Sequence, residues 1–529
     1  MELWKEMKRG DRCHPNLVTY TTVIRFLCKD GQVERALNLF DEMRGRGLEP
    51  DVVAYTALIH GFCDLDLVDK GLEWLNEMVL KGVSPNVVTY SGLINGFCKV
   101  GRWEEATELL SGMAERGIEL DVFTYTILID GLCKDGKGKQ AMRMLGLMVE
   151  KGEEPNTTTY NVLINQLCKE GSMDDAVEFF KRMVVKGKTP DVVTYNTLIA
   201  GLCEVEKIND AVKLLEEMLD GGCSAKPDTR SFNTIIHGFC RRGNINQALD
   251  IYEMMIKRDY GCDLVTYNLL IGGLFKIQKA SRARQLHKEM ILKGLEPNSF
   301  TYSIIINGLC KMGLVDAAED YLREMKNNGN NIDLFDYNAL LEAMCRRRMM
   351  DRAMNLFQQM NDYCKPDVIT FTTLINGACR SGNFEHAKEV LEDMLQRGLS
   401  PDSITYATWI NRFAKSGRLE EAKKVFEQMI TSGFSPDVAV YDTLFHGFRK
   451  KGEKGEIIDL LRHMAANDVA LDLQVVSTIL SCLSIDGDDH INLKYLPTFS
   501  KQLSKGGLSS HELLKELHKS CPGLQMQPA

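Results

Sequence analysis

The chain has 529 residues, of which 44% are hydrophobic, with a formal net charge of −9 and a pI of about 5.7. This length allows several domains or one long array, and the charge excludes a bulk attraction to nucleic acid or to an anionic membrane. No apolar run approaches the roughly 18–20 residues that span a bilayer, and residues 1–16 resemble neither a signal peptide nor a transit peptide. We expect no membrane association, and a targeting peptide that is not part of this chain.

Two segments flank a long array. Residues 1–16 look like the second half of an earlier repeat, so the chain is expected to be a fragment or to have a wrongly assigned start. Residues 473–529 are expected to form a degenerate repeat and a C-terminal helical cap, as terminal repeats of solenoids commonly do. The cap includes HELLKELH, which lacks the spacing of an HExxH zinc motif.

Thirteen similar repeats fill residues 17–472. The step is 35 residues, except for one repeat of 37 (192–228) and one of 34 (334–367). Position 27 is Met in every repeat, from Met43 to Met464, and position 4 is always Tyr or Phe. Such a period is typical of solenoids, in which each repeat buries its apolar face against its neighbours. The repeats begin at residues 17, 52, 87, 122, 157, 192, 229, 264, 299, 334, 368, 403 and 438.

Each repeat is predicted to contain two helices of about a dozen residues. The first, such as VVTYNTLIAGLCEV, follows a Pro-Asp or Pro-Asn turn, and the second, such as INDAVKLLEEMLD, is rich in Ala, Leu, Glu and Met. Both length changes fall after the invariant Met, in a segment with the Gly and Pro of a surface turn. The fold class is therefore predicted to be all-α, a solenoid of stacked helix–turn–helix repeats.

The first helix has two distinct faces. Positions 4, 7, 8, 11 and 12 share one arc and are predicted to pack; in one repeat they are Tyr195, Leu198, Ile199, Leu202 and Cys203. Positions 2, 5 and 13 fall nearly opposite, on a face predicted to be exposed. Position 2 is mostly apolar and position 5 is small and polar. Position 13 is Lys or Arg in eleven repeats, with Asp64 and Glu204 as the exceptions.

Repeated along a solenoid, these positions form three rows that fit single-stranded nucleic acid. An apolar row can sandwich bases, a polar row can bind their edges, and a cationic row can hold phosphates. The apolar row comprises Val18, Val53, Val88, Phe123, Val193, Val265, Phe300, Phe335, Ile369 and Ile404. The cationic row comprises Lys29, Lys99, Lys134, Lys169, Arg241, Lys276, Lys311, Arg346, Arg380, Lys415 and Lys450.

The repeat VTYNTLIxGLCKxG…A…EM…G…PD resembles the pentatricopeptide repeat in its plain form, over roughly residues 1–485. The resemblance implies a right-handed α-solenoid superhelix that binds single-stranded RNA at one nucleotide per repeat, with N-terminal repeats toward the 5′ end. Position 5 and the last residue of each repeat are implied to select the base, position 2 to sandwich it, and position 13 to contact phosphate. Similar proteins act in plant mitochondria or chloroplasts in RNA cleavage, end maturation, stability, splicing or translation. A mitochondrial location is expected, with the chloroplast as the alternative.

The family's code, applied repeat by repeat, implies the target 5′-GAGAUUUYGUG-3′. The first seven pairs are Thr21/Asp51, Thr56/Asn86, Ser91/Asp121, Thr126/Asn156, Asn161/Asp191, Asn196/Asp228 and Asn233/Asp263. The next four are Asn268/Asn298, Ser303/Asp333, Asn338/Asp367 and Thr372/Asp402. Asn268/Asn298 is compatible with C or U. The pairs Ala407/Asp437 and Asp442/Asp472 depart from the code, so no base is assigned to the last two repeats. Arg230 at position 2 and the long turn of the repeat from 192 also depart from the pattern.

Other interpretations of these residues remain open at this point. Asp or Asn at the last position is also a favoured helix N-cap, and a cation at position 13 suits a helix C-terminus even without phosphate. Ten cysteines at position 12 are predicted to be small core residues, because no CxxC pair exists to hold a metal. They are Cys28, Cys63, Cys98, Cys133, Cys168, Cys203, Cys240, Cys310, Cys345 and Cys379.

Two rival classes of function fit the sequence less well. A tetratricopeptide-like protein-interaction scaffold has a period of 34 and a recurrent Trp, whereas the four Trp residues here share no register. An RNA-editing relative would carry HxE and CxxC deaminase motifs, which do not occur after Asp472. We therefore expect no catalytic residue, metal or cofactor, and a monomer whose partners are RNA and a separate nuclease or processing factor.

Overall fold

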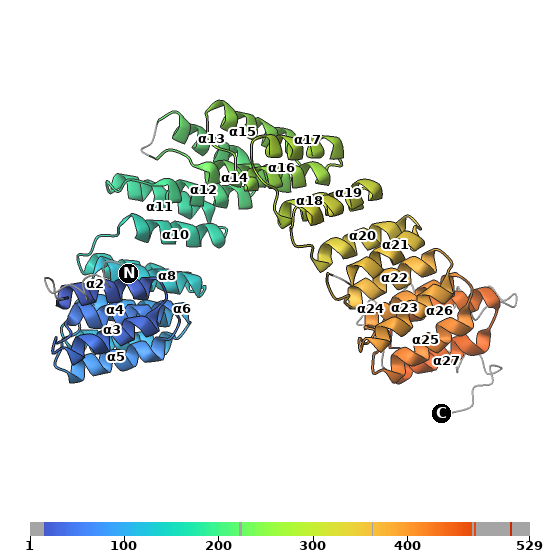
Figure 1. Cartoon of the computed structure of the whole chain (residues 1–529), viewed down its shortest axis with the longest axis horizontal. Helices are drawn as coiled ribbons and strands as arrows, with labels where there is room; N and C mark the ends of the chain where they lie inside the picture. The colour runs from blue at the N-terminus through green and yellow to red at the C-terminus, as the bar shows by residue number, and fades with distance from the viewer. Residues whose placement is uncertain (1–14, 222–224, 362, 468–469, 472–507, 510–529) are drawn as a thin grey trace. The chain divides into compact units, whose positions relative to one another are not determined.

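The computed structural model describes residues 15–221, 225–361, 363–467, 470–471 and 508–509. Within these ranges the chain forms 26 α-helices, α2 to α27 (Figure 1), and one antiparallel pair of two-residue strands, β1 (Ala470–Leu471) and β2 (Leu508–Ser509). The predicted all-α fold of stacked helical pairs is confirmed. The predicted partial repeat at residues 1–16 and the predicted degenerate repeat and cap at 473–529 lie outside the described residues, apart from residues 15–16 and β2.

Along the chain, the first helix of each repeat is followed by a turn and then by the second helix. Twelve of the thirteen have 13 residues, so their C-termini fall at position 13. They are α2 (Leu17–Lys29), α4 (Val52–Asp64), α6 (Val87–Lys99), α8 (Val122–Lys134), α10 (Thr157–Lys169), α12 (Val192–Glu204), α14 (Thr229–Arg241), α16 (Leu264–Lys276), α18 (Ser299–Lys311), α20 (Leu334–Arg346), α22 (Val368–Arg380), α24 (Ser403–Lys415) and α26 (Val438–Lys451).

The second helices end close to the invariant methionine. They are α3 (Val33–Gly45), α5 (Val68–Leu80), α7 (Trp103–Glu115), α9 (Gly138–Glu150), α11 (Met173–Val185), α13 (Ile208–Leu219), α15 (Ile245–Lys257), α17 (Ala280–Leu292), α19 (Val315–Asn327), α21 (Met350–Met360), α23 (Phe384–Gln396), α25 (Leu419–Thr431) and α27 (Lys454–Ala466).

The chain divides into two compact blocks, which we call the N-terminal block (Met1–Leu270) and the C-terminal block (Ile271–Ala529). The division falls within α16. In each block a first helix packs against the second helix of its own repeat and against the first helix of the next, as α2 does with α3 and α4. Each block is therefore a two-layer stack with the first helices side by side.

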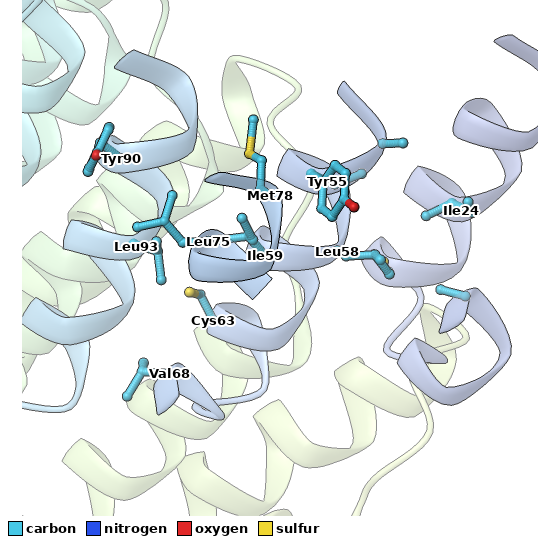
Figure 2. Packing of buried hydrophobic residues seen from close by; sticks show 14 of the residues in the cluster. Ile24, Tyr55, Leu58, Ile59, Cys63, Val68, Leu75, Met78, Tyr90 and Leu93 are labelled. Carbon is cyan, nitrogen blue, oxygen red and sulfur yellow. The ribbon is translucent and has the colours of Figure 1, made fainter. Parts of the chain in front are cut away.

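The core lies between the two layers. Tyr55, Leu58 and Ile59 of α4 are at most 1% exposed, and they lie near Ile24 and Met78 in the cluster that Figure 2 shows. Burying such side chains stabilises a fold by about 1.5–3 kcal/mol each. All thirteen position 27 methionines are at most 2% exposed. The row of methionines is therefore part of the core.

Neighbouring first helices approach closely where position 10 is glycine. A Cβ added to Gly61 would lie 2.7 Å from the Cβ of Cys28, and one added to Gly96 would lie 2.8 Å from that of Cys63. These distances leave no room for a larger residue without a shift of the helix. Glycine at position 10 thus packs against the position 12 cysteine of the preceding repeat, which explains why the two recur together.

Candidate nucleic-acid interface

The position 2 side chains lie on the surface. The ten apolar residues of this row are 48% to 69% exposed, whereas Tyr195, two positions after Val193 on the same helix, is 6% exposed. Thr158, Arg230 and Ala439 occupy position 2 in the remaining repeats and are also exposed. A regular row of exposed large apolar side chains marks a binding surface more often than a random scatter does.

Position 5 is more buried than predicted. The prediction that it shares the exposed face with positions 2 and 13 is wrong for six side chains, which are at most 9% exposed: Thr21, Thr56, Ser91, Thr126, Asn233 and Asn268. The other five are half-buried: Asn161, Asn196, Ser303, Asn338 and Thr372. The reason is that most of these side chains hydrogen-bond residues of the next repeat, so the neighbouring first helix covers them.

An asparagine at position 5 is bonded directly to the last residue of its repeat. Nδ2 of Asn161 donates to Oδ1 of Asp191 at 3.1 Å. The hydroxyl of Thr194, at position 3 of the next repeat, lies 2.6 Å from Oδ1 of Asn161 and 2.9 Å from Oδ1 of Asp191. Both side chains of the predicted pair are therefore held in fixed orientations, and Thr194 links them.

The same network recurs at three further repeats. The amide-to-carboxylate distances are 3.1 Å for Asn196 and Asp228, 3.0 Å for Asn233 and Asp263, and 3.4 Å for Asn338 and Asp367. Ser231, Thr266 and Thr370 provide the linking hydroxyl. The two extra residues of the repeat from 192 leave its pair intact, because the insertion lies in the turn before Asp228. The members of the predicted pair Asn268/Asn298 belong to different blocks, Asn268 to the N-terminal block and Asn298 to the C-terminal block.

The last residues are also helix N-caps. Oδ1 of Asp191 accepts the backbone N–H of Thr194 at 2.9 Å, and every other first helix except α16 is capped in the same way by the Asp or Asn before it. In α16 the N–H of Thr266 makes this bond to Asp263 at 2.8 Å. Capping and pairing with position 5 therefore coexist on one carboxylate, which has lone pairs for several donors.

The hydrogen bonds keep three of these carboxylates ionised. Burial acts to raise the pKa of Asp191, but donation from the Thr194 backbone, the Asn161 amide and the Thr194 hydroxyl outweighs it, so the pKa is lowered. The same balance lowers the pKa of Asp228 and Asp263. Each of these pairs thus combines an amide N–H donor with an anionic acceptor.

A threonine at position 5 reaches the last residue through a hydroxyl relay. The hydroxyls of Thr56 and Thr89 lie 2.7 Å apart, and Thr89 donates to Oδ1 of Asn86 at 3.1 Å. Thr126 uses Thr159 in this way, and Thr372 uses Thr405 at 2.6 Å. Sequence reasoning missed this role of position 3, although a signal was present. Position 3 is Thr or Ser in ten of the thirteen repeats; the exceptions are Ala54, Asp336 and Val440.

Three position 5 hydroxyls take no part in such a relay, and each donates to a carbonyl of its own helix. Thr21 donates to the backbone carbonyl four residues earlier at 2.8 Å. Ser91 donates to the carbonyl three residues earlier at 3.1 Å, and Ser303 to the one four residues earlier at 3.0 Å. For Thr21 the cause is the next position 3 residue, Ala54, which has no hydroxyl.

The pairs Thr21/Asp51 and Ser91/Asp121 lack the hydrogen-bonded link that joins the asparagine pairs. Within the described residues no hydrogen bond joins Thr21 to Asp51 or Ser91 to Asp121. Asp51 and Asp121 are half-buried rather than exposed, because each caps the first helix that follows. Each carboxylate accepts the backbone N–H three residues later, at 2.9 Å and 2.8 Å respectively. The structure thus shows a capping role for both residues, and their role in selecting a base stays a prediction.

Asp336 places a carboxyl group where most repeats have a hydroxyl. It is 1% exposed, and its Oδ1 has no hydrogen-bond partner within the described residues. Burial raises the pKa of Asp336 to about 6; a hydrogen bond from Ser303 opposes this and the charge of Asp333 adds to it. The pair Ser303/Asp333 therefore adjoins a buried acid that the other repeats lack.

A cavity of about 430 Å³ in the C-terminal block brings the predicted site residues of two repeats together. Its lining includes Ile369 and Ile404 from successive position 2 sites, the pair Thr372/Asp402, and Arg380 from position 13. This volume is within the range of about 300–1,000 Å³ that is typical of small-molecule pockets. All three predicted kinds of residue thus line one hollow between neighbouring first helices.

The position 13 cations are all exposed, and a larger share of them has an acidic partner in the N-terminal block, although no ion pair involves Lys29 or Lys169 in the described residues. In the N-terminal block Lys99 lies 3.3 Å from Asp64, and Arg241 lies 2.8 Å from Glu204. These two acids are the position 13 exceptions, so each neutralises the cation one repeat later. Lys134 also lies 2.7 Å from Asp130. In the described part of the C-terminal block no ion pair involves Lys311, Arg380, Lys415 or Lys450.

The position 12 cysteines lie in or beside the core and form no disulfide in the described residues. Seven are buried, and Cys98, Cys168 and Cys203 are half-buried. Burial raises the pKa of Cys345 to about 12, which keeps the thiol protonated and unreactive. Among the described residues no group of His, Cys, Asp and Glu is placed to hold a metal ion, and no helix is both long and apolar enough to cross a membrane.

The stacked helical pairs and their regular surface rows define an α-solenoid repeat protein. The sequence pattern of the PPR repeat family matches eleven segments, and that of the PPR repeat matches residues 300–330. The chain belongs to the PPR repeat family. The eleven segments are residues 15–64, 50–99, 93–134, 128–169, 155–204, 190–225, 227–276, 262–311, 333–380, 366–415 and 408–450.

One of the similar solved structures, that of PPR10 from maize, has the same fold class. The pentatricopeptide repeat protein PPR10 from maize has 23% identity and a TM-score of 0.57, over 97% of this chain and 82% of that one. PPR10 in complex with an 18-nt psaJ RNA element has 22% identity and a TM-score of 0.48, over 96% and 88%. The PPR domain of Arabidopsis thaliana protein-only RNase P 1, in complex with tRNA, has 21% identity and a TM-score of 0.28, over 33% and 91%. No curated protein matches the chain.

Proposed function

We propose that this protein binds single-stranded RNA sequence-specifically, at one base per repeat, with 5′-GAGAUUUYGUG-3′ as its target. It has no catalysis of its own in this proposal, and acts in the processing, end maturation or stabilisation of an organellar transcript, in the mitochondrion. The observation that carries the proposal is the cavity lined by Ile369, Ile404, Thr372, Asp402 and Arg380. Membership of the PPR repeat family supports it.

In this cavity a base would lie between Ile369 and Ile404, as planar groups do between apolar side chains. Its edge would face Thr372 and Asp402, and its phosphate would lie near Arg380. The hydroxyl relay from Thr372 through Thr405 to Asp402 fixes these groups before RNA arrives. Such preorganisation favours affinity, because the side chains lose little freedom on binding.

The chemistry of the last residue agrees with the bases assigned to it. An ionised carboxylate accepts hydrogen bonds only, so Asp191, Asp228 and Asp263 fit uracil, which has a ring N–H. Guanine also has a ring N–H and is assigned to repeats that end in Asp. Adenine has a ring nitrogen acceptor instead and is assigned to repeats that end in Asn86 and Asn156, whose amides donate.

Bound RNA would be held unpaired along the first helices. A complex of this kind blocks an exonuclease, melts a hairpin or exposes a site to a separate nuclease, without a catalytic residue in the solenoid. An RNA end that loses its definition when the protein is missing would support the role in processing, and unchanged transcript ends would contradict it.

The direct test is a titration of fluorescent GAGAUUUUGUG RNA against a scrambled RNA of the same composition, at physiological salt. Each matched base contributes about 1–3 kcal/mol of discrimination, by analogy with bidentate base contacts, so the target is expected to bind at least 100-fold more tightly. Equal affinity for the two RNAs would contradict base recognition. A protein-interaction scaffold would bind neither RNA measurably.

A further inference from the structure

A second cavity in the C-terminal block is lined mostly by cations. It has a volume of about 450 Å³, and its lining comprises Arg346, Arg348, Arg380, Arg412 and Lys415 together with Cys379 and Ser416. No acidic side chain is part of this lining. Three of the five cations belong to position 13 of successive repeats. We call the five side chains the cation cluster.

The other two cations occupy positions where most repeats have glycine. Arg412 is at position 10 and Arg348 at position 15, and each of these positions is Gly in nine repeats. Arg348 has a left-handed backbone, with φ of 59°, a conformation that costs a non-glycine residue of order 1 kcal/mol. Arg412 adjoins Cys379, the contact that a position 10 glycine makes elsewhere. Both arginines therefore replace the usual glycine, and both line the same cavity.

The positive charge of the cluster is poorly compensated within the protein. In the described residues no ion pair involves Arg348, Arg380 or Lys415, and Arg346 lies 3.6 Å from Glu342. Nε of Arg412 donates to the neutral amide of Asn376 at 2.9 Å. Burial and the charge of Arg380 lower the pKa of Arg412, although a guanidinium remains protonated at neutral pH. A bound anion would relieve this repulsion.

We propose that the cation cluster binds a phosphomonoester dianion, and that its occupant is the 3′-terminal phosphate of the bound RNA. A phosphodiester carries one negative charge, whereas a phosphomonoester carries about 1.5 to 2 at pH 7. Five converging cations match the higher charge. Arginine side chains also bind phosphate oxygens in a bidentate manner.

The place of the cluster fits the end of the recognised sequence. The cavity shares Arg346 and Arg380 with the one that holds Thr372 and Asp402, the last pair that the code assigns. The phosphate that follows the eleventh base would therefore lie within reach of the cluster. This placement rests on the proposed function, with N-terminal repeats toward the 5′ end, whereas binding of phosphate itself does not.

The experiment compares the full chain with the variant R348G/R412G. This variant restores the glycine of the other repeats, so the fold is expected to persist, as thermal melting monitored by circular dichroism would verify. The control K288A/K424A removes two exposed lysines from α17 and α25, for which the described residues record no ion pair. It has the same net charge as the variant. The ligands are inorganic phosphate, measured by calorimetry, and GAGAUUUUGUG RNA with a 3′-hydroxyl, a 3′-phosphate or a 5′-phosphate.

The full chain and the control are expected to bind the 3′-phosphorylated RNA about tenfold more tightly than the 3′-hydroxyl form, as one or two charge-assisted hydrogen bonds provide. R348G/R412G should lose this gain and also lose binding of inorganic phosphate. A scrambled RNA should gain equally from a 3′-phosphate. If the proposed base recognition is wrong, the preference for the target over the scrambled RNA should be absent. The gain from the 3′-phosphate and the binding of inorganic phosphate should nevertheless remain.

Three results would overturn the proposal. The first is equal affinity of the full chain for the 3′-hydroxyl and 3′-phosphate forms. The second is a gain from the 5′-phosphate alone, which would contradict the assignment to the 3′ end. The third is phosphate binding that R348G/R412G leaves unchanged, which would place the anion outside the cation cluster.

Discussion

The two blocks carry the same row of position 13 cations in different electrostatic settings. In the N-terminal block Lys99 and Arg241 are neutralised by Asp64 and Glu204, each one repeat earlier. In the C-terminal block Arg380 and Lys415 have no such partner in the described residues and line the cation cluster. The net charge of −9 therefore conceals a local excess of positive charge.

This difference shows that the effect of a position 13 cation depends on whether an acidic side chain lies beside it. Exposed ion pairs contribute only about 0–1 kcal/mol to stability, so the acids at position 13 have little effect on the fold. Their effect falls on ligands, because a paired cation attracts a phosphate less than an unpaired one. We infer that the C-terminal block holds the RNA backbone more strongly, whereas the N-terminal block depends more on its base contacts.

The largest expected effect comes from removing unpaired cations. The variant K311A/R380A/K415A should lower RNA affinity about 100-fold and reduce the magnitude of the salt slope by about 2, since each phosphate contact contributes about 0.7. The matched variant K99A/K134A/R241A removes three cations that already have acidic partners. It should lower affinity by less than tenfold, as measured by titrations at several salt concentrations. Equal losses for the two variants would contradict the difference between the blocks.

A smaller effect concerns the buried acid in the C-terminal block. Because burial raises the pKa of Asp336 to about 6, above its unfolded value, the folded protein binds the proton more tightly than the unfolded chain. Its contribution to stability is present at low pH and is lost as the pH rises through 6. Asp336→Thr should therefore increase the free energy of unfolding at pH 7 by about 2 kcal/mol.

Urea denaturation of the wild type and Asp336→Thr between pH 5 and pH 8 measures this contribution. The advantage of the variant should shrink as the pH falls from 7 to 5. The reverse substitution Thr370→Asp, at the same position of the next repeat, is the matched control and should destabilise the protein at pH 7. An advantage for Asp336→Thr that stays constant with pH would show that ionisation of Asp336 is not its cause.

The smallest effect comes from releasing the paired cations of the N-terminal block. The variant D64N/E204Q frees Lys99 and Arg241 and should raise RNA affinity about threefold, which corresponds to exposed pairs of less than 1 kcal/mol. The control E34Q/E178Q removes two exposed acids from the second helices α3 and α11 and should raise affinity less. If both variants raise RNA affinity equally, the cause is the change in net charge and not the release of Lys99 and Arg241.

The helices and the core follow from features of a single repeat. Tyr195, Leu198 and Ile199 share an arc of one helix, and the invariant methionine marks the second helix, so their burial could be predicted. The burial of position 5 could not, because Thr56 is covered by Thr89 of the next first helix. A helical wheel places side chains around one axis and contains no information about the neighbouring helix.

The rest of the candidate site escaped prediction for two further reasons. Thr194 links Asn161 to Asp191 from the following repeat, so its role depends on contacts between repeats. Arg348 and Arg412 occur once each, at two different positions of two different repeats. A search for what all repeats share discards such residues, and only the fold brings them to one cavity.

The central claim is that position 5 and the last residue select one base per repeat. The variant Thr372→Asn changes the Thr/Asp pair of the repeat from 368 into the Asn/Asp pair seen at Asn161 and Asp191, with Thr405 available as the linking hydroxyl. Affinity for RNAs that end in G or U at the eleventh base is the decisive measurement. The account predicts that the wild type prefers G and Thr372→Asn prefers U, by about tenfold each. An unchanged preference for G in the variant would contradict it.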